Sequence, residues 1–199
     1  MHSFLGISSE LSVAELHKEH IANSEYCYME GYLVTSPCAK EANILARKVA
    51  EANGVKTAFT FSDPGIVEFF GDQLKETIGD GIDLLFCNEK EALQYTQKDN
   101  IGDAIDVIKT FSKNFAITLG AEGAAVYDGT TLFEIAPHKV TAVDTNGAGD
   151  NFAGAFLYGI THGMNYQQAG DLASKTAAQV VTGFGPRLKP EEYRKLVQG

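Results

Sequence analysis

Short apolar runs alternate along the chain with longer stretches in which apolar residues recur at helical spacing. Within residues 36–54, apolar side chains fall at i, i+3, i+4, i+7 and i+8, which predicts an amphipathic helix that ends near Gly54. Apolar runs without this period predict strands. Strands are expected at 26–34, 56–62, 82–87, 114–120, 123–128 and 131–135, and helices at 36–54, 65–78, from 88, 101–112, from 149, 166–181 and 190–197.

The alternation of strands and helices predicts an α/β fold. Parallel strands need crossover connections, so we expect a parallel sheet covered by helices on both faces, with ligands at the carboxyl ends of the strands. The chain has no internal repeat, low-complexity tract or linker, which predicts one α/β domain over residues 1–199. Residues 2–8 are expected to form a strand that starts abruptly, as if the chain opened inside a larger architecture.

Composition limits the classes of function. The 199 residues carry a net charge of −10, which argues against non-specific binding to nucleic acid or anionic membranes. Three scattered cysteines, with no CxxC pair, are typical of reduced thiols in a cytoplasmic protein. The sequence shows no signal peptide and no apolar run of about 18 residues, so a cytoplasmic location is expected. An acidic chain must bind anions through backbone amides and helix dipoles, which makes its glycines of interest.

The run VDTNGAGDNFAGAF, residues 143–156, places Gly147, Ala148 and Gly149 between two aspartates, at the start of a helical pattern. Backbone N–H groups at a helix N-terminus lack partners and, with the helix dipole, favour anions. Small residues let a phosphate approach the backbone closely. These three residues therefore suit a cradle for phosphoryl oxygens, whose charge must be stabilised during transfer.

Asp150 has two interpretations on the residues alone. It is either a base that accepts a proton from an attacking hydroxyl or a first-turn carboxylate favoured by the helix dipole. Two rival phosphate motifs fit poorly. The P-loop pattern GxxxxGK[ST] is absent, and in the dinucleotide pattern GxGxxG the third glycine position is Phe152, which would prevent close packing of helix on strand.

Residues 144–157 (DTNGAGDNFAGAFL) resemble the C-terminal signature of the ribokinase-like (PfkB) carbohydrate and nucleoside kinases, and two motifs upstream resemble other signatures of the same family. The sequence NEKE, from Asn88 to Glu91, resembles the NxxE motif of that family. The sequence TLGAEG, from Thr118 to Gly123, resembles its ATP-binding TxGxxG loop. The motifs occur in the family's order, each at a predicted strand end. The opening residues weakly favour the adenosine-kinase-like branch.

This resemblance implies a Rossmann-like, three-layer αβα fold with a mostly parallel central sheet, and ATP-dependent phosphorylation of a hydroxyl on a sugar or nucleoside. By similarity, Asp150 would deprotonate the acceptor, and the amides of residues 147–149 would form an anion hole for the transferred phosphate. Residues with implied contacts to ATP are Asn88, Thr118, Gly120 and Gly123.

Two cation sites are also implied by the resemblance. Asn88 and Glu91, three positions apart on one helical face, would hold Mg²⁺ or its phosphate ligands indirectly through water. Their alternative interpretation is a helix N-cap and a solvated glutamate. A monovalent cation, K⁺, would be held near Asp144, which could instead cap its turn. The other candidate residues for this cation are Asn146, Val180, Gly183 and Gly185.

The resemblance covers only the later part of the family's pattern. The family's upstream segment, which holds the acceptor and carries lid strands, has no counterpart, and residues 1–34 would contain a remnant of the lid or edge strands. We therefore expect a fragment that self-associates or takes the missing part from another chain, because lost strands would expose a sheet edge. The alternative function is a nucleotide-binding or regulatory module without turnover. The sequence does not identify the molecule that accepts the phosphoryl group.

Overall fold

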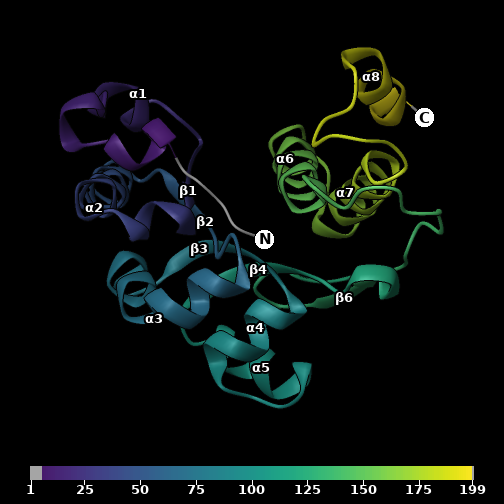
Figure 1. The fold of residues 1–199 in the computed structure, drawn as a ribbon, viewed down its shortest axis with the longest axis horizontal. Helices are drawn as coiled ribbons and strands as arrows, with labels where there is room; N and C mark the ends of the chain where they lie inside the picture. The colour runs from purple at the N-terminus through teal and green to yellow at the C-terminus, as the bar shows by residue number, and fades with distance from the viewer. Residues whose placement is uncertain (1–5, 199) are drawn as a thin grey trace. The chain divides into compact units, whose positions relative to one another are not determined.

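The computed structural model describes residues 6–198, and the chain divides into two units, Met1–Asn114 and Phe115–Gly199 (Figure 1). Within residues 6–198, six strands are hydrogen-bonded in chain order from β1 to β6. The structure is thus the α/β fold that the alternation of strands and helices predicted. The β4 strand, Ser112–Thr118, contains the boundary between the units, and each unit is described separately below.

The first unit is built on parallel strands. Strand β1 pairs in parallel with β2, and β2 with β3; for example, Ala58 in β2 faces Leu84 in β3. The helix α2 packs on β1 and β2 and buries a row of alanines against them. The elements are η1 Gly6–Glu10, η2 Val13–Glu15, α1 Lys18–Ala22, β1 Tyr26–Glu30, η3 Gly31–Thr35, α2 Pro37–Ala52, β2 Lys56–Thr60, α3 Pro64–Ile78, β3 Ile82–Asn88, α4 Glu89–Thr96 and α5 Ile101–Ile108.

The second unit combines an antiparallel ladder with a pair of long helices. Strand β5 pairs antiparallel with β4 and β6, α7 packs on β5 and β6, and α6 packs on α7. The two helices approach closely because Gly159 faces Ala169; a Cβ at Gly159 would lie 2.8 Å from the Ala169 Cβ. The elements are η4 Gly120–Glu122, β5 Ala124–Tyr127, β6 Leu132–Ile135, α6 Ala148–Thr161, α7 Tyr166–Val180 and α8 Pro190–Gln198.

Three local expectations need correction. The strand expected at 2–8 is wrong for residues 6–8, which belong to the 3₁₀ helix η1; residues 2–5 lie outside the described residues. Gly6 adopts φ 56° there, and the Ser9 hydroxyl donates to its carbonyl at 2.7 Å, which closes a turn. Strand β1 ends at Glu30 rather than 34 because the chain turns into η3. The helix expected to reach residue 112 ends at Ile108, since Ser112 already starts β4.

Candidate functional site

The N-terminus of α6 follows a tight turn at Gly147. Gly147 is the N-cap, with φ +76°, a left-handed conformation that glycine adopts without steric cost. A Cβ at this position would also overlap Pro186, coming within 2.6 Å of the Pro186 Cα. Two independent constraints therefore require glycine here, and both concern packing and backbone conformation.

Asp150 lies in the exposed first turn of α6. Outside the local backbone of α6, no heavy atom lies within 4 Å of the position that a Cβ would occupy at Gly149, so the space beside this residue is open. The amide of Ala148 donates to the Thr145 carbonyl at a long N–O distance of 3.3 Å. The first turn of a helix leaves further amides without intrahelical acceptors. The Asp150 carboxylate thus lies in the first turn of an accessible helix N-terminus. This arrangement fits both interpretations of Asp150, a proton acceptor or a carboxylate favoured by the helix dipole.

Asp144 joins the segment before α6 to the loop after α7. Its Oδ1 accepts from the Asn146 amide at 3.0 Å, and its Oδ2 accepts from the Gly185 amide at 3.1 Å. These two bonds, the Asn146 bond first, hold the pKa of the Asp144 carboxyl below its ordinary value. The carboxylate therefore caps the turn, as one interpretation of the sequence had it.

The loop that was matched to a cation site is also connected internally. The carbonyl of Val181 accepts from the amides of Val143 and Asp144, and the carbonyl of Val180 accepts from Gly183 at 3.4 Å. The structure thus brings Asp144, Asn146 and Gly185 together. Within residues 6–198, no group of three or more histidine, cysteine or acidic side chains is arranged to hold a metal ion.

In the first unit, Asn88 and Glu91 form a reciprocal capping box at the start of α4. The Asn88 Oδ1 accepts from the Glu91 amide at 2.8 Å. The two Glu91 carboxylate oxygens accept from the backbone N–H of Asn88 at 2.9 Å and from its Nδ2 at 2.8 Å. The N-cap interpretation of Asn88 is therefore confirmed.

The interpretation of Glu91 as a solvated residue is wrong, because the residue is only 3% exposed. Burial, reinforced by the negative charge of Asp63, raises the pKa of Glu91 to about 7, against the opposing effect of the bonds from Asn88. Sequence reasoning missed Asp63, which N-caps α3 by accepting from the Gly65 amide at 2.8 Å. Its sequence signal was an aspartate directly before Pro64, a pattern typical of helix starts.

The TxGxxG segment turns between β4 and β5 in the second unit. Thr118 is the last residue of β4, and Gly120 begins the short helix η4 with φ +61° and open space around it. Gly123, with φ +94°, packs against the Ile135 carbonyl so tightly that no Cβ could fit. Gly120 is thus open to a ligand, whereas Gly123 is required by its contact with the end of β6. Asn88 and Glu91 belong to the first unit and the other predicted residues to the second.

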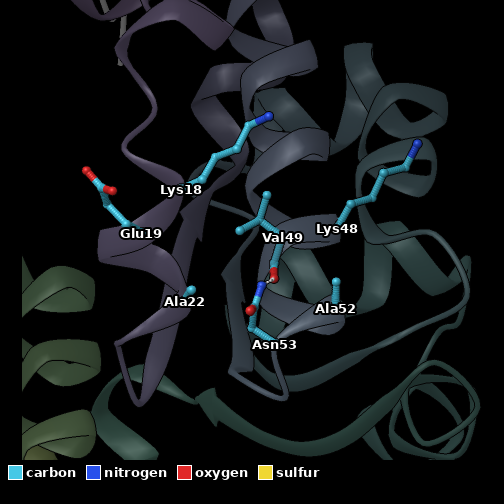
Figure 2. Close-up of a pocket in the computed structure, with 7 residues that line it drawn as sticks. All are labelled: Lys18, Glu19, Ala22, Lys48, Val49, Ala52 and Asn53. Atoms are coloured by element: carbon cyan, nitrogen blue, oxygen red, sulfur yellow. Dashed lines mark hydrogen bonds between the residues drawn. The ribbon is translucent and has the colours of Figure 1, made fainter.

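A shallow surface pocket of about 380 Å³ lies between α1 and α2 in the first unit (Figure 2). Figure 2 shows the long side chains of Lys18 and Lys48 at its rim and the bond from the Asn53 Nδ2 to the Val49 carbonyl, 2.8 Å. None of the residues predicted from motifs lines this pocket. Its lining residues are Lys18, Glu19, Ala22, Lys48, Val49, Ala52 and Asn53. Among residues 6–198, no helix has the length and apolar character that a membrane crossing requires.

Comparison with known proteins identifies the class. The chain resembles the adenosine kinase structure from Sinorhizobium meliloti with a TM-score of 0.90 and 31% identity, over 96% of this chain and 59% of that one. The sequence model described as pfkB family carbohydrate kinase matches residues 3–192. The chain therefore belongs to the PfkB family of carbohydrate kinases, and the resemblance stated from its motifs is confirmed.

Two further proteins are similar to this chain, one in sequence and one in fold. Adenosine kinase from Dictyostelium discoideum is 27% identical over 94% of this chain and 60% of its own length. Aminoimidazole riboside kinase from Salmonella enterica, solved with aminoimidazole riboside and an ATP analog, shares the fold with a TM-score of 0.75 at 19% identity, over 86% of this chain and 62% of that one. The chain thus spans 59% to 62% of the lengths of these three proteins.

Proposed function

We propose that this chain carries the phosphoryl-transfer chemistry of an ATP-dependent kinase that phosphorylates a hydroxyl of a sugar or nucleoside. The observation that carries the proposal is the pairing of Asp150 with the approachable first turn of α6, directly after the glycine-dependent turn. Membership of the PfkB family and the likeness to adenosine kinases support it. Nucleosides, adenosine first, are therefore the acceptors to test before sugars.

In the proposed reaction, the acceptor O–H bond breaks as its oxygen attacks the γ-phosphorus, and Asp150 takes the proton. The bond from the γ-phosphorus to the bridging oxygen breaks in the same displacement, and ADP leaves with the electron pair. Backbone amides at residues 147–149 stabilise the charge on the transferred phosphoryl oxygens. Because Ala148 donates to Thr145 at 3.3 Å, the phosphate must compete with a weak bond at that amide.

Contacts with the nucleotide are proposed, from family resemblance, for Thr118, Gly120 and Gly123 in the second unit and for Asn88 in the first. Of the two glycines, Gly120 has the open surroundings that contact with a nucleotide needs, and Gly123 shapes the turn that presents it. Magnesium would neutralise phosphate charge. Indirect contact of Asn88 and Glu91 with Mg²⁺ stays a proposal from family resemblance, because the two residues bond each other in the capping box and Glu91 is buried. K⁺ beside Asp144 and Asn146, with carbonyls from Val180, Gly183 and Gly185, stays a proposal from family resemblance.

The test compares Asp150→Asn with Asp103→Asn. Both aspartates are exposed and lie in the first turn of a helix, but Asp103 belongs to α5 and is not one of the proposed site residues. ADP release is measured with MgATP and a panel of nucleosides and sugars, and nucleotide binding is measured in parallel. We expect Asp150→Asn to lower turnover by about 100-fold or more while nucleotide still binds, and Asp103→Asn to leave turnover unchanged. Equal turnover in the two variants would reduce Asp150 to a dipole-stabilised surface residue.

A second candidate function is nucleotide binding without turnover. It is favoured by one observation, that the chain spans only 59% to 62% of the three kinases compared. Binding of MgATP without acceptor-dependent ADP release by the unsubstituted chain would support it over the kinase. Acceptor-dependent release would exclude it and would name the substrate.

We also propose that the chain associates with itself or with another chain that completes the kinase. Two large apolar side chains in the first unit support this, because Ile7 is 83% and Phe69 is 73% exposed. Sedimentation velocity over a range of concentrations tests the proposal. A stable monomer throughout would count against self-association, and a monomer that turns over acceptor would count against both forms.

A further inference from the structure

The side chain of Asn151, the residue after Asp150, is buried at the start of α6 and forms hydrogen bonds through both its nitrogen and its oxygen. Its Nδ2 donates to the Gly147 carbonyl at 2.7 Å and to the Pro186 carbonyl at 2.8 Å. Its Oδ1 accepts from the Tyr193 hydroxyl. Only 8% of the residue is exposed. Because the two acceptors require the NH₂ group and the Tyr193 hydroxyl requires the oxygen, the network fixes which way the amide points.

This amide acts directly on the turn that starts the helix. The Gly147 carbonyl accepts from the Asn151 side chain and also from the Asn151 backbone N–H, at 2.9 Å. The peptide unit is planar, so fixing the Gly147 oxygen also fixes the direction of the Ala148 N–H on the other side of the same plane. The Asn151 side chain therefore helps to set the orientation of the Ala148 amide.

The C-terminal segment 186–193 supplies the other half of the arrangement. The Tyr193 hydroxyl, from α8, accepts from the Leu188 amide at 3.1 Å while it donates to Asn151. Pro186 closes over Gly147 so tightly that no Cβ fits between them. Residues more than 35 positions away in sequence thus hold the Gly147 turn from outside, through one carbonyl, one ring and one hydroxyl.

A buried asparagine that binds a backbone carbonyl is also a common structural device. Asn43 is an example in the first unit: it is 4% exposed, and its Nδ2 donates to the Glu30 carbonyl at 3.0 Å. Asn151 differs because the carbonyl it holds belongs to the peptide that opens the proposed phosphate site. Asn43 is therefore the matched residue against which a purely structural role can be measured.

We propose that Asn151 and Tyr193 are positioning residues for the reaction, which orient the Ala148 amide through the Gly147 carbonyl and so couple the start of α6 to the docking of α8. The proposal rests on the proposed kinase function for its kinetic consequence, but its geometric consequence can be measured in a chain without turnover. It requires that loss of the Tyr193 hydroxyl change the α6 start while the fold is kept.

The first experiment compares Tyr193→Phe with Tyr158→Phe in the full chain. Tyr158 lies on α6 itself, is 38% exposed and stacks on His162. For Tyr193→Phe we expect the ¹H–¹⁵N resonances of Ala148 and Gly149 to move and their amide exchange to accelerate, with Tyr158→Phe unchanged at both amides. We also expect kcat to fall about tenfold, the scale of one hydrogen bond, with KM for MgATP changed less than twofold.

The second experiment compares Asn151→Ala with Asn43→Ala, because each removes a buried amide from a backbone carbonyl. Both variants should lower the melting temperature, and only Asn151→Ala should move the Ala148 and Gly149 resonances. Unchanged resonances in both Tyr193→Phe and Asn151→Ala, at any loss of stability, would overturn the proposal. If the unsubstituted chain releases no ADP with any acceptor, the kinase proposal fails, and the resonances still decide whether these residues set the α6 start.

Discussion

Replacement of Glu91 by glutamine tests how strongly the buried capping box at α4 depends on pH. The Glu91 carboxyl has a pKa of about 7 in the folded chain against an ordinary value of 4.5, chiefly because burial disfavours its ionised form. At about 1.4 kcal/mol per pKa unit, this difference amounts to about 3 kcal/mol of linkage between protonation and folding. The residue is only 3% exposed, so solvent screening reduces this free energy little.

The direction follows from which state binds the proton more tightly. The folded chain holds a proton on Glu91 up to about pH 7, whereas the unfolded chain releases it near pH 4.5. The contribution of this group to stability is therefore fully present below pH 4.5 and is lost as the pH rises through 7. Between pH 4.5 and pH 8 the free energy of unfolding should fall by about 3 kcal/mol from Glu91 alone.

Urea unfolding at a series of pH values measures this loss, and the quantity of interest is the difference in slope between the parent chain and Glu91→Gln. Glutamine does not titrate, so the variant should lack this part of the decline, and other titrating groups cancel in the comparison. Glu89→Gln is the control, because Glu89 is exposed in the same helical turn. If Glu91→Gln and the parent chain declined in parallel from pH 4.5 to pH 8, the assignment of a proton to buried Glu91 would be refuted.

Two glycine comparisons test the packing derived for the turns. Gly147→Ala should destabilise the chain by about 2 kcal/mol or more in thermal unfolding, because its φ is +76° and Pro186 occupies the space of the new methyl. Gly154→Ala is the comparison: this glycine lies in open space on α6, so alanine there should stabilise the chain by about 0.5–1 kcal/mol. Gly123→Ala should cost more stability in urea unfolding than Gly120→Ala, because both have positive φ but only Gly123 packs against the Ile135 carbonyl; equal losses would contradict the role of that contact.

Helices and strands could be predicted where the spacing of apolar residues agrees with residues that typically start or end such elements. The helix expected within residues 36–54 is α2, Pro37–Ala52, since its apolar positions repeat at helical spacing and Pro37 suits the first turn. The strand expected at 26–34 is too long, because apolar character continues through η3 while the backbone turns. Glycine is required at position 31 because a Cβ there would lie 2.6 Å from the Phe61 carbonyl oxygen, a contact between segments that a local pattern does not contain.

Site residues were predictable where their chemistry is local. The capping box of Asn88 and Glu91 follows from residue types three positions apart, and both partners are present. The burial and the raised pKa of Glu91 could not be predicted in the same way. The burial depends on the packing around α4, and the pKa responds also to the charge of Asp63, 28 positions earlier in the sequence. The contacts of Asn151 could not be predicted for the same reason, since its partners Pro186 and Tyr193 lie 35 and 42 positions away in the sequence.

The motif glycines separate into two kinds once the structure is known, and the distinction changes how they should be tested. Gly123 and Gly147 have no room for a methyl group, so their presence is required by packing whether or not a ligand binds. Gly120 and Gly149 have open space at the Cβ position, and packing does not explain their choice. Gly149 has no positive φ, so alanine there should leave the fold intact and obstruct only an approaching phosphate. A loss of nucleotide binding or turnover in Gly149→Ala therefore reports on the site itself, which the same change at Gly147 cannot do.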